Sequence, residues 1–329
     1  MSFKDLPKIE LHLHHEAAAP PAFIRQMAQE KKIDISGIFD ERGNYVDRDF
    51  DHFIDVYDAA TQALKTPDDF RRLTYVALEE TASSGVIYCE TFVSPDFCGG
   101  GDLIAWREYL AAIREGADAA ERDFGIVHRP IVTCLRHLGP DKAKPVARCA
   151  AETVGDYLVG FGMAGAELMG RPGDFAYAFD MAREAGLHLT CHAGEWGGPD
   201  MVADTLRDLR PSRIGHGINA VRDDALVDRL AEDGVVLEVC PGSNVVLKAV
   251  TSWTAHPIAK LRERGVKVTV STDDPPFFHT TMTREFEMLH RTFGWDEGDF
   301  AELNQTALDA AFCDADTKAA LAKRLKDAA

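Results

Sequence analysis

The sequence lacks the features of several protein classes. Its seven cysteines form no Cys-x-x-Cys pair and no spacing typical of a small disulfide-rich domain, so we expect reduced thiols. No segment approaches the run of about 20 apolar residues that a membrane-spanning helix needs. The first seven residues, MSFKDLP, contain no apolar stretch of a signal peptide. A disulfide scaffold and a membrane protein are therefore disfavoured, and we expect a cytoplasmic protein.

Basic charge is also in short supply. The chain has 36 Lys and Arg against 54 Asp and Glu, a net charge of −18 with His neutral. Such a chain offers no general basic surface for nucleic acid or anionic lipid. We therefore expect a small-molecule partner, with no nucleic acid and no membrane. The sequence is compatible with a homo-oligomer but contains no signal for one.

The chain alternates short β-rich runs with longer helical segments. Eight runs dense in Val, Ile and Leu are the expected strands: residues 9–14, 86–93, 127–135, 158–163, 188–192, 213–217, 235–240 and 267–272. Such runs are typical of parallel strands covered by helices. Helical segments at 175–186, 225–234 and 257–265 each end at a glycine. The pattern predicts an α/β fold, a (β/α)₈ TIM barrel forming one catalytic domain over residues 1–329, with a doubly wound sheet as the alternative.

One connection is far longer than the loops usual in β/α units. Between the first two expected strands we place a helical insertion at about residues 17–80. Apolar residues at helical spacing predict a helix over 49–57, and Thr66-Pro67 marks the start of another. Because loops after strands gather at the mouth of a barrel, this insertion is either a lid over a site or additional packing.

Histidines and a carboxylate stand where several expected strands end. The first strand ends in His-Leu-His, and a period of two places His12 and His14 on the same side, about 7 Å apart along the strand. The fifth strand ends at His192, and the eighth leads into Asp273. Since all these ends lie at one face of a barrel, the four side chains should converge. Three imidazoles and a carboxylate suit one Zn²⁺ ion, although nickel, cobalt or iron could use the same ligands.

Several motifs resemble those of the adenosine/adenine deaminase family of metal-dependent amidohydrolases. They are residues 7–14 (PKIELHLH), 163–167 (MAGAE), 192–195 (HAGE), 213–217 (RIGHG), 240–244 (CPGSN) and 271–275 (STDDP). The insertion is similar to the family's helical cap, so the resemblance spans nearly the whole chain. It implies a hydrolase of purine metabolism.

The resemblance implies a catalytic role for several residues. His12, His14, His192 and Asp273 would hold one Zn²⁺ ion that activates water for attack on C6 of a purine. Glu195 would protonate ring N1. His216 would orient the attacking oxygen and stabilise charge, and Asp273 would take part in catalysis as well as in metal binding.

The substrate contacts implied by the resemblance are less uniform. Asp274 would hydrogen-bond purine N7, the backbone N–H of Gly165 would reach N3, and His14 and Glu16 would also contact the substrate. An acidic residue at the position of Glu16 contacts the ribose in adenosine-specific members, but Glu is also common in adenine-specific relatives.

Three other positions depart from the family's pattern. His15 precedes Glu16 where an apolar residue is frequent, and alternation directs its side chain away from the barrel. Ala17 replaces a glycine, so this loop must adopt an ordinary backbone conformation. Ala166 stands where relatives often have Asp.

These observations favour hydrolytic deamination of a 6-aminopurine, with adenosine as the first candidate substrate and adenine as the alternative. Another mononuclear amidohydrolase, acting on an amide, lactone or phosphoester, is a less favoured interpretation. Residues 158–167 contain no Lys that could bridge two metal ions. A non-catalytic barrel that binds purine or stores metal is disfavoured because such a protein would not need Glu195 and His216.

Overall fold

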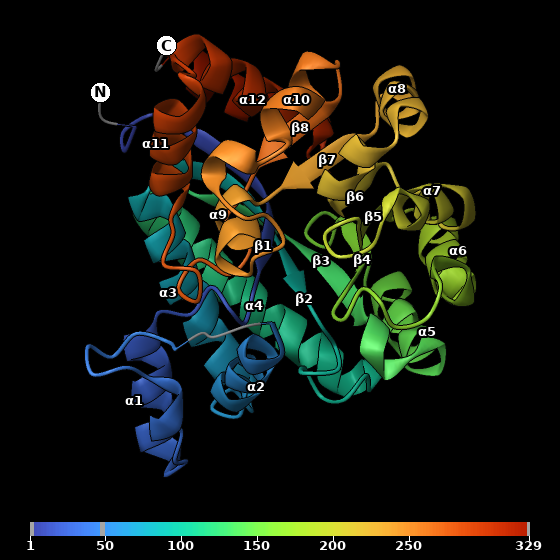
Figure 1. Ribbon diagram of the computed structural model, residues 1–329. Helices are drawn as coiled ribbons and strands as arrows, with labels where there is room; N and C mark the ends of the chain where they lie inside the picture. Colours follow the sequence, from blue (N-terminus) through green and yellow to red (C-terminus); the bar gives the residue numbers. More distant parts are fainter. Residues whose placement is uncertain (1–2, 47–49, 328–329) are drawn as a thin grey trace.

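Eight parallel strands form a barrel in sequence order, β1 to β8, in this computed structural model (Figure 1). The structure describes residues 3–46 and 50–327. The strands are β1 Lys8–His14, β2 Val86–Val93, β3 Val127–Leu135, β4 Gly160–Ala164, β5 His188–Ala193, β6 Arg213–His216, β7 Val236–Val239 and β8 Lys267–Val270. Every expected strand is present, with ends that differ from the prediction by at most two residues.

The barrel closes between its first and last strands. Leu13 forms a parallel bridge with Asp273 just beyond β8. The N–H of His14 donates to the carbonyl of Asp273 (2.9 Å), and the N–H of Asp273 donates to the carbonyl of His12 (3.1 Å). The predicted (β/α)₈ architecture is confirmed, and an open doubly wound sheet is excluded.

Most of the helices surround the strands of the barrel (Figure 1). The helices are α1 Pro21–Lys31, α2 Phe50–Thr61, α3 Pro67–Ser83, α4 Leu103–Phe124, α5 Pro140–Ala151, α6 Ala176–Glu184, α7 Pro199–Asp208, α8 Asp224–Asp233, α9 Pro241–Val246, α10 Ile258–Glu263, α11 Met282–Phe293, α12 Glu297–Ala310 and α13 Ala315–Asp327. Gly234 ends α8 in the left-handed conformation, as its position predicted. Among the described helices, none combines the length and apolar composition needed to cross a membrane.

The insertion between β1 and β2 contains α1, α2 and α3. Thr66 caps α3 and forms a capping box with Asp69, which explains why this helix begins there. The expected helix over 49–57 is α2, and position 49 lies outside the described residues. Phe53 of α2 packs on Phe278, with ring centroids 5.2 Å apart. Since Phe278 follows β8, the insertion is anchored beside the barrel's C-terminal mouth.

Candidate active site

Four side chains converge at the C-terminal mouth of the barrel. The donor atoms of His12, His14, His192 and Asp273 all lie within 4.8 Å of one another. His14 Nε2 is 3.2 Å from His192 Nε2 and 3.2 Å from Asp273 Oδ1, and His12 Nε2 is 3.3 Å from the same oxygen. The Ser243 hydroxyl donates to Asp273 Oδ2 (2.6 Å), which leaves Oδ1 directed at the imidazoles. The convergence predicted from the strand ends is observed.

The geometry of this cluster fits a single metal ion. Ligand atoms that lie about 2.0–2.1 Å from one zinc ion are separated by about 3–3.5 Å, close to the three separations given above. His12 Nε2 and Asp273 Oδ1 are buried and make no hydrogen bond to any described residue. Unpaired buried donors and acceptors are costly, and an ion bound between them would satisfy both. The four residues therefore form a candidate metal site.

A buried carboxylate on β7 orients the first of these imidazoles. Glu238 Oε2 accepts a hydrogen bond from His12 Nδ1 (2.8 Å), while Glu238 Oε1 accepts from Thr190 Oγ1 (2.8 Å) and Arg213 Nε (2.6 Å). Burial opposes ionisation of Glu238, but Arg213 and His12 hold its pKa below the ordinary value. Because Glu238 accepts the Nδ1 proton of His12, Nε2 is the ring atom that can bind a metal ion. Sequence analysis missed Glu238; its signal was a lone carboxylate within the apolar run 235–240.

The backbone is unusual at two of the site residues. His216 (φ 59°) and Asp273 (φ 67°) both lie in the left-handed region, which is rare for residues other than glycine and common at functional sites.

Gly215, on β6, lies too close to two imidazoles for a larger residue. A Cβ atom there would lie 2.9 Å from His12 Cε1 and 3.1 Å from His192 Nδ1. Only glycine lets β6 pass this close to two imidazoles.

Glu195 lies in the turn after β5, and a second carboxylate holds that turn. Glu167 accepts the N–H groups of Gly194, Glu195 (3.0 Å) and Trp196 (2.8 Å). Burial, together with the negative charges of Asp273 and Glu167, raises the pKa of Glu195 well above its ordinary value. This raised pKa favours the protonated form of Glu195, which borders the cavity. Glu167 belongs to the 163–167 motif, but sequence analysis assigned it no role.

A chain of hydrogen bonds fixes the proton position of His216. The N–H of Ile258 donates to His256 Nδ1 (3.2 Å), so His256 Nε2 carries the proton and donates to Asn244 Oδ1 (3.2 Å). Asn244 Nδ2 then donates to His216 Nδ1 (3.2 Å) and to Glu195 Oε1 (3.3 Å). Burial lowers the pKa of His216 to about 3. His216 is thus neutral, with Nε2–H facing the cavity 3.8 Å from Glu195 Oε2.

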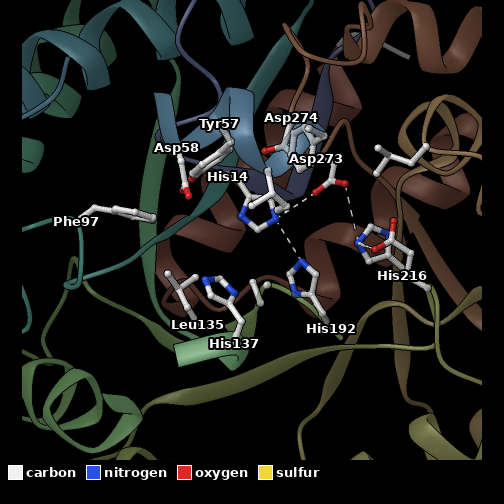
Figure 2. Close-up of a pocket in the computed structure, with 16 residues that line it drawn as sticks. His14, Tyr57, Asp58, Phe97, Leu135, His137, His192, His216, Asp273 and Asp274 are labelled. Carbon is white, nitrogen blue, oxygen red and sulfur yellow. Dashed lines mark hydrogen bonds and ion pairs between the residues drawn. The ribbon is translucent and has the colours of Figure 1, made fainter. Parts of the chain in front are cut away.

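A cavity lies between the four candidate metal ligands and helix α2 (Figure 2). Its walls are formed by residues of the candidate metal site, by the ends of β3, β4 and β5, and by one face of α2. The lining residues are His14, Phe53, Ile54, Tyr57, Asp58, Phe97, Leu135, His137, Ala164, Gly165, His192, Glu195, His216, Leu247, Asp273 and Asp274. Because α2 supplies four of them, the insertion forms one wall of the cavity. His137, to which sequence analysis assigned no role, also lines it.

Asp274 and Gly165 also line this cavity. Asp274 is buried, and its Oδ1 has no hydrogen-bond partner among the described residues. Burial, and then the charge of Asp273, raise the pKa of Asp274 to about 8. Gly165 has φ +90°, and a Cβ atom there would lie 2.6 Å from His137 Nδ1. Glycine is therefore required where the chain passes His137.

Glu16 and His15 lie outside the cavity lining. Glu16 is 5% exposed, and its Oε2 accepts a hydrogen bond from the Tyr57 hydroxyl (3.2 Å). His15 is buried and hydrogen-bonds threonine hydroxyls of β2 and α3. Its side chain points away from the four candidate metal ligands, as alternation along β1 predicted. The structure thus groups His14, Gly165 and Asp274 at the cavity and keeps Glu16 behind Tyr57.

Comparisons with known proteins agree with this geometry. The family model described as adenosine deaminase matches residues 7–328. An adenine deaminase from Rhizobium rhizogenes is 46% identical over 322 residues, which cover 97% of this chain and 99% of that protein. The crystal structure of an adenine deaminase from Arthrobacter aurescens superposes with a TM-score of 0.89 at 30% identity, covering 98% of each chain. An amidohydrolase from Burkholderia ambifaria, solved with bound Zn, has a TM-score of 0.87 at 29% identity, covering 99% of this chain and 91% of that one.

Proposed function

We propose that this chain, which belongs to the adenosine deaminase family, is a zinc-dependent adenine deaminase. It would convert adenine and water to hypoxanthine and ammonia. The observation that carries the proposal is the 46% identity, over nearly the full length of both chains, to a protein named adenine deaminase. Sequence analysis ranked adenosine first and adenine second, and this relative favours the reverse order. The shielding of Glu16 by Tyr57 supports the same choice.

His12, His14, His192 and Asp273 would hold the zinc ion. The fit of their donor atoms to one ion and the zinc bound by the Burkholderia amidohydrolase support this assignment. Bound zinc lowers the pKa of water towards neutrality and so makes a nucleophile available at pH 7. Glu238 supports the site by keeping the proton of His12 on Nδ1.

Glu195 and His216 are the proposed proton-handling residues. Glu195 is protonated because its pKa is raised, so it can donate a proton to ring N1 and make C6 more electrophilic. The N–H at His216 Nε2 faces the same space and can stabilise negative charge that develops on the oxygen attacking C6. Asp273 would be a metal ligand and would also accept the proton that the attacking water loses. This proton would pass to the amino group, so that ammonia leaves as the C6–N bond breaks, and the remaining hydroxyl proton would return to Glu195.

The remaining contacts orient the base. Asp274, protonated because its pKa is raised to about 8, can donate to the lone pair of purine N7. The backbone N–H of Gly165 can donate to N3, and His14 borders the bound ring. Glu16 contributes indirectly, through Tyr57. These four contacts are proposed from the cavity lining together with the family's motifs.

Ammonia release by the zinc-loaded protein, with adenine and adenosine in separate reactions, tests the proposal. We expect kcat/KM for adenine to exceed that for adenosine by at least about a hundredfold, within the range that pocket contacts supply. Equal or better turnover of adenosine would replace the proposal with a nucleoside deaminase. No ammonia from either compound, with one zinc per chain confirmed, would favour another amidohydrolase substrate or a non-catalytic barrel.

A further inference from the structure

We propose that Tyr57, on helix α2, is the specificity-determining residue that restricts this site to free purine bases. Its ring would occupy the space into which a substituent on N9 extends, and its hydroxyl holds the carboxylate that a sugar hydroxyl would otherwise reach. The inference rests on the proposed deamination of adenine, because it concerns the opposite end of the same bound base.

The chemistry of the purine ring defines which wall of the cavity matters. C6 must face the four candidate metal ligands. N3 lies opposite C6 in the six-membered ring, and N9 is bonded to C4, the atom that neighbours N3. A sugar on N9 therefore extends away from the cluster. Figure 2 shows Tyr57 and Phe97 on the side of His14 opposite to His216 and Asp273. That is the side on which adenine and adenosine differ.

Both the hydroxyl group and the ring of Tyr57 contact neighbouring side chains. Its hydroxyl donates to Glu16 Oε2 (3.2 Å). Its ring lies 6.0 Å, centroid to centroid, from each of Phe53, Phe97 and Phe277. A side chain restrained both by a hydrogen bond and by aromatic neighbours cannot rotate away without losing both kinds of contact. Tyr57 is therefore a fixed wall of the cavity.

Glu16 explains why the tyrosine excludes a sugar chemically as well as sterically. Its carboxylate is nearly fully buried, and Oε1 has no hydrogen-bond partner among the described residues. An unpaired carboxyl oxygen can accept a hydrogen bond from a hydroxyl group whether or not the carboxyl group is ionised. Because Tyr57 lines the cavity and Glu16 does not, removing the tyrosine side chain would open space and uncover this acceptor together.

The test compares the zinc-loaded wild type with Tyr57→Ala and Tyr57→Phe, using adenine, 9-methyladenine and adenosine as substrates. In Tyr57→Ala, we expect kcat/KM for 9-methyladenine to rise because space is available. We expect kcat/KM for adenosine to rise further, by about tenfold, the upper end of the range that a hydrogen bond to an uncharged group supplies. Tyr57→Phe keeps the ring and should retain the preference for adenine.

Ile54→Ala is the matched control, because Ile54 lies on the same helix and lines the same cavity but is not one of the aromatic residues that pack around Tyr57. It should not raise adenosine turnover. Unchanged ratios in a folded, zinc-loaded Tyr57→Ala protein would overturn the inference, as would equal relaxation in Tyr57→Phe or Ile54→Ala. If the wild type releases no ammonia from adenine, the proposed function itself has failed.

Discussion

Replacing Glu238 by Gln should weaken metal binding although Glu238 touches no metal. All three partners of this carboxylate, His12 Nδ1, Thr190 Oγ1 and Arg213 Nε, approach it as donors. A glutamine has only one oxygen and must turn its NH₂ group towards one of them. If the NH₂ faces His12, the imidazole proton must move to Nε2, the atom that should bind the metal. If the NH₂ faces Arg213, two donors oppose each other in a buried site.

The expected loss of zinc affinity follows from the position of the hydrogen bond between His12 and Glu238. The hydrogen bond between His12 and Glu238 is 2.8 Å long, and both side chains are fully buried, so water cannot replace it. Loss of such an outer contact typically lowers metal affinity by about tenfold to a hundredfold. That range corresponds to about 1.4–2.7 kcal/mol. We expect the Glu238→Gln protein to lose zinc at a correspondingly lower chelator concentration.

Zinc affinity would be measured by chelator competition, with thermal unfolding of the metal-free proteins alongside. Glu90→Gln is the control, because Glu90 pairs with Arg213 (2.6 Å) in the same buried network but does not contact His12. It should lower stability without changing zinc affinity. Equal zinc affinity in wild type and Glu238→Gln, or equal losses in both variants, would refute the assigned role of Glu238.

Three further predictions concern the acid, the strand beside the imidazoles and a buried carboxyl on α11. Glu195→Gln should keep its zinc content and lose kcat by about a hundredfold to ten-thousandfold in the ammonia assay, as expected when a general acid is removed; full activity would exclude Glu195 from proton transfer. Gly215→Ala should lower zinc content after dialysis, because the added Cβ would lie 2.9 Å from His12 and 3.1 Å from His192; unchanged zinc content would show that the strand can shift. Burial raises the pKa of Glu285 to about 8 from 4.5. The folded state therefore keeps a proton that the unfolded state releases, and between these pH values wild type should lose stability relative to Glu285→Gln by up to about 1.4 kcal/mol per pH unit. Chemical denaturation across this range checks the slope, and parallel curves for the two proteins would contradict it.

The sequence by itself determined the barrel fold and the convergence of the four candidate metal ligands. Both follow from local signals: apolar runs dense in β-branched residues, a period of two that orients His12 and His14, and polar residues at strand ends. In a parallel barrel all strand ends of one kind meet at one face, so His192 and Asp273 could be placed beside the first two ligands before any contact was known.

The tertiary structure alone decided which side chains pair across the barrel. Glu238 reaches His12 from β7, and Tyr57 reaches Glu16 from the insertion, although neither pair is close in sequence. Such contacts depend on barrel register, on rotamers and on the position of α2 over the mouth, none of which a strand's periodicity specifies. For this reason sequence analysis could assign Glu16 to the substrate but could not detect the tyrosine that covers it.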